Sequence, residues 1–232
     1  METFAPRPSS GTLADLRPGD HACCVYATED DHRRFLTAFI RDGLARGEKI
    51  LYIVEQHNPL DIVTSLQDAG VELEQPLARE QFGLVTADGT YLRQGRFDPE
   101  RMIALFRDEV RRAVGEGYHT FRGTGEMSWS LRAAAGADRL IEYESLINAV
   151  DINAHALLLC QYDRRCFGAE RLLETMAVHP LILLDGGLYR NPLTRADDAP
   201  EAWRAWLDSP ESRDGALRRE VASLLTEREH PV

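Results

Sequence analysis

The sequence predicts an α/β fold, a three-layer sandwich with a mostly parallel sheet. Apolar runs of strand length alternate with amphipathic helical segments over about 170 residues, which is the pattern of such sandwiches. The stretch from His21 to His57 reads as strand, helix and strand, and a unit of this kind most often opens a parallel sheet. Two short apolar runs flank Gly186-Gly187, which predicts antiparallel edge strands near the C-terminus.

The opening unit has clear boundaries. His21–Tyr26 is rich in strand formers, and residues 50–54 form a continuous apolar strand. The helix between them begins after Thr28, which stands three residues ahead of Asp31 as in a capping box, and ends near Gly47. Apolar side chains follow helical spacing between these ends: Phe35, Leu36, Phe39, Ile40 and Leu44.

The turn between the first strand and its helix is acidic. In nucleotide-binding units of this kind the turn is a glycine-rich loop ending in Lys-Ser/Thr, and its N–H groups and lysine hold phosphates. Residues 27–32 contain no glycine and three carboxylates, and the only lysine of the chain is Lys49, across the helix. Negative charges at this position repel a phosphate, so we expect the architecture without the phosphate site.

The later elements alternate in the same way. Predicted helices begin at Asn58-Pro59, Asp98-Pro99, about Asp138 and about Gly168, and end near Gly70, Gly117, Asp151 and Ala177. Predicted strands span residues 82–86, 118–122, 156–162, 181–184 and 188–189, with a loop over residues 123–129. The run at residues 156–162 is the most hydrophobic, which favours the centre of the sheet.

Three parts of the chain differ in composition. Residues 1–18 contain three prolines and two serines and are expected to form an N-terminal arm, residues 19–195 form the predicted domain, and residues 196–232 form a helical extension. Trp203 and Trp206 of the extension either dock on the same domain or contact a partner or a second subunit.

Composition excludes several classes of function. The net charge is −11 and the pI about 5.1, which disfavours binding to nucleic acid or to an anionic membrane, and no helix-turn-helix is evident. No stretch approaches the roughly 20 apolar residues of a membrane span, and the N-terminus lacks the features of a signal peptide. We therefore expect a cytoplasmic protein whose four cysteines are free thiols.

The carboxyl ends of the predicted strands supply a candidate binding site. In open α/β sheets, ligands bind outside these ends, and aromatic walls with a few polar groups suit a small, weakly polar ligand. The alternatives are solvated glutamates in loops and a tryptophan that caps the core. The side chains at these ends are Tyr26, Glu55, Glu126, Trp129, Tyr162 and Asp163.

A second set of polar side chains lies within predicted strands and helices. His21, Cys23 and Cys160 are either hydrogen-bonded or packed in the core, or they form a metal or thiolate site. Two ligands, His21 and Cys160, are too few for structural zinc, so neither a metal nor a cofactor is expected. Glu144 and Asn148 are an i, i+4 pair on one helix face.

Several short motifs together resemble the MEDS domain, a sensory domain of methanogens, methylotrophs and the DcmR regulator. The resemblance covers roughly residues 15–195, and the order and spacing of the motifs make the combination specific. The matching segments are Gly19-Asp-His-Ala-Cys23, Gly43-Leu-Ala-Arg-Gly-Glu-Lys-Ile-Leu-Tyr-Ile53, Gly125-Glu-Met-Ser-Trp129, Tyr143-Glu144 with Asn148, Leu159-Cys-Gln-Tyr-Asp163 and His179-Pro180.

The resemblance implies a fold like RecA and KaiC with an eroded phosphate loop, and it raises the functional interest of His21. It implies a role in sensing small hydrocarbon derivatives. Such domains occur alone or fused to output domains, and the roughly 37 residues after Arg195 are too few for one. The expected partners are therefore a small organic ligand and a regulatory protein, such as a kinase, an anti-sigma factor or a transcription regulator, or a second copy of the chain.

Three hypotheses of function follow. The first is a non-catalytic sensory domain that binds a small organic ligand and relays its presence to a regulatory partner. The second is a degenerate nucleotide-binding protein of the ATPase fold that uses the loop Arg122-Gly-Thr-Gly-Glu126. The third is a redox or metal sensor that uses His21, Cys23 and Cys160.

Overall fold

An eight-stranded sheet forms the centre of the computed structural model, which describes residues 10–149, 154–193, 198–209, 212 and 215–229. The strand order is β1-β8-β7-β2-β6-β5-β3-β4. All neighbours from β7 to β4 pair in parallel, whereas β8 and β1 add antiparallel pairs at one edge. The strands are β1 (Ser10–Thr12), β2 (His21–Tyr26), β3 (Lys49–Val54), β4 (Phe82–Thr86), β5 (Phe121–Glu126), β6 (Ala156–Asp163), β7 (Leu181–Leu184) and β8 (Gly187–Arg190).

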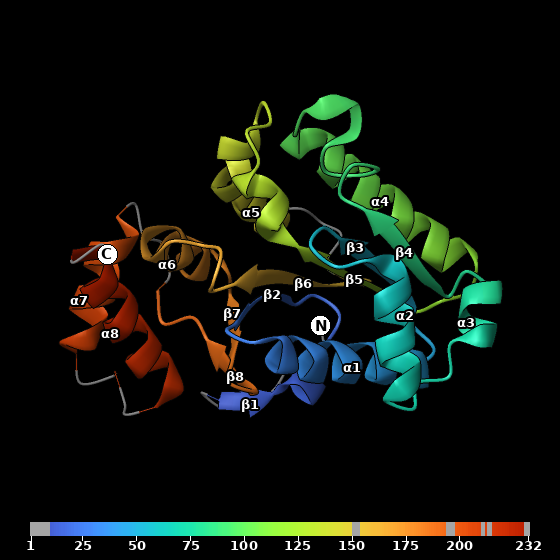
Figure 1. Cartoon of the computed structure of the whole chain (residues 1–232), viewed down its shortest axis with the longest axis horizontal. Coiled ribbons are helices and arrows are strands. Elements are labelled where there is room, and N and C mark those ends of the chain that lie inside the picture. The colour runs from blue at the N-terminus through green and yellow to red at the C-terminus, as the bar shows by residue number, and fades with distance from the viewer. Residues whose placement is uncertain (1–9, 150–153, 194–197, 210–211, 213–214, 230–232) are drawn as a thin grey trace.

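Helices cover both faces of the sheet, which confirms the predicted three-layer sandwich (Figure 1). One face is covered by α1 (Glu29–Ala45) and α2 (Pro59–Asp68), with the short α3 (Glu74–Ala78) beside β4. The opposite face is covered by α4 (Pro99–Gly115), α5 (Leu140–Ala149) and α6 (Ala169–Val178).

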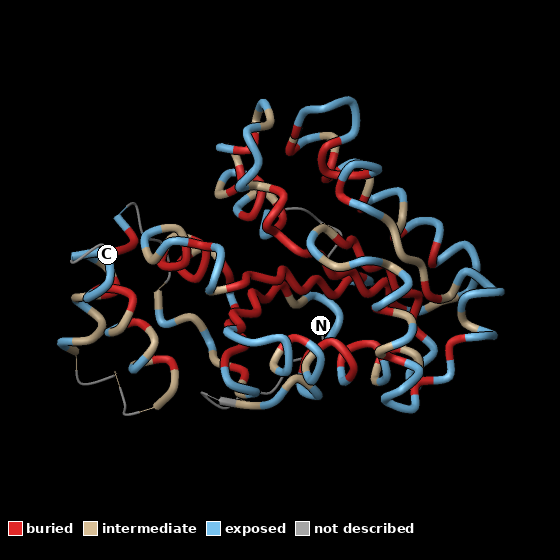
Figure 2. Tube along the Cα trace, viewed as in Figure 1, coloured by how far each residue is buried: buried red, intermediate tan, exposed pale blue. Residues whose placement is uncertain are grey.

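The central strands are buried on both faces, and their side chains divide between two cores. Figure 2 shows a continuous band of buried residues along these strands. Successive strand residues point to opposite faces. Ala22 and Cys24 of β2 therefore join the core under α1, whereas Cys23 and Val25 join the core under α4, α5 and α6. We call these two sides the α1 face and the α5 face.

Side-chain caps set the helix starts that the sequence predicts. Thr28 accepts a hydrogen bond from the backbone N–H of Asp31 at the start of α1. Asn58 and Asp98 cap α2 and α4 in the same way, each followed by proline at the first helical position.

The β5 strand differs from its prediction. It spans Phe121–Glu126 and not residues 118–122, because two glycines that read as a loop lie inside it. A Cβ on Gly123 would lie 2.7 Å from Leu158, and one on Gly125 would lie 2.5 Å from the hydroxyl of Tyr91. Close packing therefore requires these glycines within the strand.

The edge near the C-terminus is the predicted hairpin of β7 and β8. Its two turn residues, Asp185 and Gly186, both have positive φ angles of 50° and 76°, as a tight two-residue turn requires. Residues 10–12 of the predicted N-terminal arm pair with β8 as β1 and extend this edge, while residues 1–9 of the arm lie outside the described residues.

The C-terminal helices α7 (Ala199–Leu207) and α8 (Ala216–Glu229) lie beside α6 (Figure 1). The buried ring of Trp203 donates a hydrogen bond from Nε1 to the backbone oxygen of Leu173, 3.0 Å away. Arg164 forms ion pairs with Glu220 and Glu227 of α8 at 2.6 and 2.5 Å. The extension thus docks on the same domain. No helix in the described part of the chain is long and apolar enough to cross a membrane.

A buried arginine joins β5 to the α1 face. The Arg122 side chain has no exposed surface and forms ion pairs with Glu48 and Asp42. Its guanidinium also donates a hydrogen bond of 2.9 Å to the backbone oxygen of Phe39. Each of the three guanidinium nitrogens thus donates to α1 or to the segment that follows it.

We predict that Arg122→Ala destabilises the fold by about 3–5 kcal/mol, because it leaves the buried Glu48 carboxylate without its partner. The measurement is the midpoint of urea denaturation. The control is Arg111→Ala, which removes an exposed pair with Asp108 and is expected to leave stability almost unchanged. Equal effects of the two substitutions would contradict the role of Arg122.

Candidate functional site

The structure divides the predicted site residues into separate groups and does not bring them all into one pocket. Alternation along the strands sends them to opposite faces of the sheet. Tyr26, Glu55, Glu126 and Asp163 lie at the carboxyl edge, with Glu126 on the α1 face. A second group converges on the α5 face, and Trp129 is separate from both groups. The second group consists of His21, Cys23, Glu144, Asn148, Cys160 and Tyr162.

Glu126 organises the carboxyl edge. Its buried carboxylate accepts the backbone N–H groups of Glu55 and Gln56 at 2.7 and 2.5 Å. It also accepts the hydroxyl of Tyr52 at 2.5 Å and faces Nδ1 of His57 at 2.7 Å. Burial alone would raise the pKa of Glu126, but the hydrogen bonds from His57 and Tyr52 outweigh burial and hold that pKa below its usual value.

Two stacked histidines lie beside this carboxylate. The rings of His32 and His57 are parallel within 3° and 4.2 Å apart. The hydrogen bond with Glu126 raises the pKa of His57 to about 9. Burial, together with the neighbouring His57, lowers the pKa of His32 to about 4. At neutral pH the pair is therefore a charged ring stacked on a neutral one.

The carboxylates of the acidic turn form ion pairs with neighbouring basic side chains. Glu29 lies 3.0 Å from Nε2 of His57 and 2.5 Å from Arg165, while Asp30 and Asp31 pair with arginines one turn along α1. The hydroxyl oxygen of Thr28 accepts the hydrogen bond from the backbone N–H of Asp31. The described side chains at this helix start thus leave no cationic cradle for an anion.

Glu55 has a different role from Glu126. Its two carboxylate oxygens accept hydrogen bonds from Nε and Nη2 of Arg132 at 2.6 and 2.7 Å, and Nη1 of Arg132 donates to Asp88. Asp163 pairs in turn with Arg165 at 2.6 Å. Both carboxylates are largely buried and paired with arginine, so neither is a solvated loop residue.

An apolar pocket of about 580 Å³ lies on the α1 face beside the ends of β2 and β7. Its walls include Cys24 and Tyr26 of β2, Phe35 and Ala38 of α1, and Leu183 of β7. Tyr26 is the one residue of the predicted site among its lining side chains.

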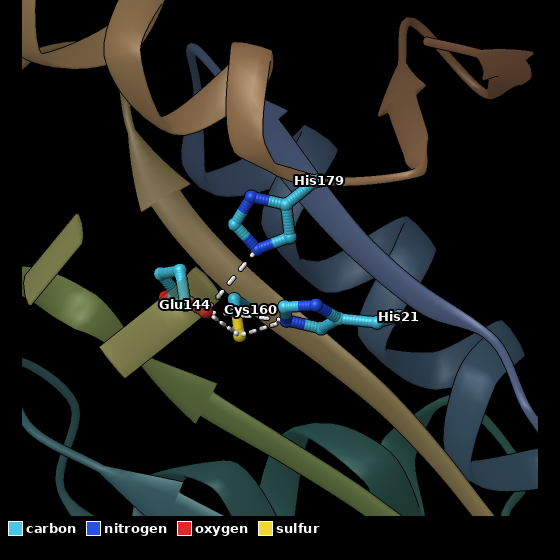
Figure 3. A group of neighbouring side chains, drawn as sticks. All are labelled: His21, Glu144, Cys160 and His179. Carbon is cyan, nitrogen blue, oxygen red and sulfur yellow. Dashed lines mark hydrogen bonds and ion pairs between the residues drawn. The ribbon is translucent and has the colours of Figure 1, made fainter. Parts of the chain in front are cut away.

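A fully buried polar cluster lies on the α5 face (Figure 3). The Oε2 atom of Glu144 lies 3.2 Å from Nε2 of His21, 3.4 Å from Nε2 of His179 and 3.4 Å from Sγ of Cys160. Burial would raise the pKa of Glu144, but His179 and His21 outweigh burial and hold that pKa far below its usual value. Burial and the Glu144 charge raise the pKa of the Cys160 thiol.

Trp129 belongs to the core and not to a pocket wall. Its ring has no exposed surface and lies 4.8 Å from the ring of Tyr91 and 4.2 Å from that of Phe97. The short 3-10 helix over Met127–Leu131 turns it inward beneath the loop.

Sequence reasoning missed Tyr52, His32 and His57 at the edge, and His179 in the buried cluster. Tyr52 lies in an apolar strand and His32 at a buried position of a helix. A polar side chain at such a position was the sequence signal that could have identified them. His179 is the C-cap residue of α6, and its Nδ1 forms a hydrogen bond of 2.6 Å with the Thr175 oxygen. Its second nitrogen points into the cluster (Figure 3).

The fold is that of the KaiC-like proteins. A KaiC-like protein from the hyperthermophilic archaeon Pyrococcus horikoshii OT3 superposes with a TM-score of 0.52 at 12% sequence identity, over 73% of this chain and 72% of that one. The order of parallel strands and the helices on both faces thus define the class as a RecA-type α/β domain.

Within that class the chain belongs to the MEDS family, described as the MEthanogen/methylotroph, DcmR Sensory domain, whose model matches residues 20–180. It is also similar to the transcriptional repressor DcmR of Methylorubrum extorquens, with 21% identity over 166 residues. That match covers 71% of this chain and 60% of the repressor. Membership places the chain among sensory domains, and all motifs of the resemblance begin within or next to the matched region.

We predict that His57 titrates near pH 9 and that Glu126→Gln moves its pKa down toward the ordinary value of 6.5. Because the folded pKa is raised, the His57–Glu126 pair stabilises the fold fully below about pH 6.5, and that contribution is lost as the pH rises through about 9. Ring chemical shifts in NMR measure the titration. Glu142→Gln, at a distant exposed carboxylate, is the control, and a wild-type His57 that titrates near 6.5 would contradict the pairing.

Proposed function

We propose that this chain is a non-catalytic sensory domain that binds a small organic molecule of the hydrocarbon-derivative class in the pocket beside β2. The observation that carries the proposal is a preformed, mainly apolar pocket of about 580 Å³ in a member of a sensory-domain family. Binding pockets of roughly 300–1,000 Å³ are typical for small molecules.

The lining of the pocket favours a weakly polar occupant. Tyr26 and Phe35 supply aromatic walls, and Leu183 and Leu184 add aliphatic surface from β7. Polar side chains are fewer: Asp31, Arg34 and Asp42 come from α1, Thr12 from β1 and Asp185 from the turn after β7. Such an arrangement orients a small molecule by a few polar contacts and binds it mainly by burying apolar surface.

The carboxylates of the carboxyl edge support a role without catalysis. In the ATPase relatives of this fold, the strand ends carry the carboxylates that activate water and bind the metal. Here Glu126 is occupied by backbone N–H groups, Tyr52 and His57, and Glu55 is occupied by Arg132. Neither is left to act on a nucleotide.

A regulatory protein is the proposed recipient of the signal. The similar DcmR is a transcriptional repressor, which supports a kinase, an anti-sigma factor or a transcription regulator as partner. The pocket lies between α1 and the hairpin edge of β7 and β8, so an occupant that prefers one arrangement of these elements would shift the population recognised by the partner. A second copy of the chain is the other candidate.

The pocket is tested by Ala38→Trp, which places an indole in the space that the ligand would fill. We predict at least a tenfold loss of affinity, about 1.4 kcal/mol, for the tightest binder in a panel of chloroalkanes and short-chain alcohols, with little change in stability because Ala38 is exposed. Saturation-transfer NMR measures the binding. Ala45→Trp, at an exposed α1 position outside the pocket, is the matched control, and unchanged binding in Ala38→Trp would contradict the assignment.

The acidic turn generates a second prediction. The paired carboxylates of residues 29–31 repel a triphosphate, so no ATP affinity should be measurable by calorimetry at physiological Mg²⁺. A micromolar dissociation constant for ATP would contradict the non-nucleotide assignment and favour a degenerate nucleotide-binding protein.

A further inference from the structure

Four metal-ligating side chains meet on the α5 face from four different elements. His21 begins β2, Glu144 lies in α5, Cys160 lies in β6 and His179 follows α6. Each has at most 5% of its surface exposed. Their donor atoms all lie within 4.8 Å of one another, and Figure 3 shows them directed at a common centre.

Hydrogen bonds outside the cluster fix the orientation of both histidines. The amide nitrogen of Asn148 donates to the Val178 oxygen at 2.7 Å, so its Oδ1 accepts from Nδ1 of His21 at 2.9 Å. Nδ1 of His179 donates to the Thr175 oxygen at 2.6 Å. In the neutral form of each ring, Nε2 then carries a lone pair and no proton.

The cluster therefore contains more acceptors than donors. Nε2 of His21, Nε2 of His179 and Oε2 of Glu144 face one another, and the thiol of Cys160 supplies one weak donor. Nε2 of His179 has no hydrogen-bond partner among the described residues, although it is completely buried. Converging lone pairs around a buried carboxylate call for a cation.

We propose that His21, Glu144, Cys160 and His179 bind one zinc ion. Tetrahedral zinc with bonds of about 2.0–2.3 Å separates its ligand atoms by about 3.3–3.5 Å. Four of the six separations match this geometry: 3.2 and 3.4 Å from Oε2 of Glu144 to the two histidine nitrogens, 3.4 Å from sulfur to Oε2 and 3.5 Å from sulfur to Nε2 of His21. The other two separations are within 4.8 Å.

The charges of the ligand set also match zinc. Binding releases the Cys160 proton to solvent, so a thiolate, a carboxylate and two neutral imidazoles surround a divalent ion and the net charge is zero. A neutral centre suits a completely buried site. The mixed nitrogen, sulfur and oxygen donors disfavour Mg²⁺ and Ca²⁺, which select oxygen ligands.

Hydrogen bonds from neighbouring groups orient the ligands of the site. Tyr162 donates its hydroxyl to the other oxygen of Glu144 at 2.5 Å, leaving Oε2 for the metal. Asn148 and the Thr175 oxygen orient the two histidine rings. With four protein ligands the ion has no open position, so the site is not a catalytic one, and it is distinct from the pocket on the α1 face.

Metal content of untagged protein tests the proposal. After zinc reconstitution and dialysis we expect about one zinc per chain by mass spectrometry of the metal, and loss of that zinc in Cys160→Ser and His179→Gln. Cys24→Ser changes another buried cysteine, on the opposite face of the sheet, and this control should retain its zinc. Wild-type protein without stoichiometric zinc, or Cys160→Ser with the wild-type amount, would overturn the proposal.

Cobalt substitution keeps the test decisive if those variants fold poorly. Wild-type protein loaded with Co²⁺ should show a tetrahedral spectrum with a thiolate-to-cobalt charge-transfer band. Bound cobalt without that band would remove Cys160 from the ligand set and overturn the site as proposed.

Asn148 is a positioning residue in this account. Asn148→Ala should weaken zinc binding about 10- to 100-fold in competition with a chelator, because the His21 ring loses its orienting acceptor. Asn148→Asp keeps an acceptor and should restore most of the affinity. Equal zinc affinity in Asn148→Ala and the wild type would contradict the orienting role.

Discussion

The buried carboxylate of Glu144 is the constraint on which the α5 face depends. An ionised carboxylate without exposed surface costs several kcal/mol unless opposite charge and hydrogen bonds compensate it. Tyr162, Cys160 and two histidine rings surround Glu144, and they come from two strands and the end of a helix. The need to compensate one charge thus joins segments that are more than a hundred residues apart in the chain, such as His21 and Glu144.

A sheet that is buried on both faces keeps the two candidate sites apart. Along β2, His21 and Cys23 point to the α5 face, whereas Cys24 lines the pocket on the α1 face. The fold is KaiC-like, and the carboxylates in the turn between β2 and α1 pair with nearby basic side chains. Carboxylates such as Asp31 and Asp42 also line the pocket on the α1 face and disfavour an anionic occupant, which agrees with the proposed sensory role.

Local signals predicted most of the fold, because hydrophobic periodicity and helix caps depend only on residues that are close together in the sequence. The capping residue Thr28 predicted the start of α1, and Gly186 predicted the turn of the hairpin. The sequence could not show that Gly123 lies inside β5, because that follows from the packing of Leu158 against it. The site was less predictable than the fold. The alternation of side chains along each strand decides which face of the sheet a residue joins. The contact of His179 with Glu144 depends on how α6 and α5 pack.

The central question is whether a zinc ion neutralises the lone pairs that converge beside Glu144. Anomalous diffraction on either side of the zinc absorption edge, from crystals of untagged protein, answers this without any substitution. We predict a single strong peak within bonding distance of His21, Glu144, Cys160 and His179. The absence of a peak at this position would contradict the zinc site.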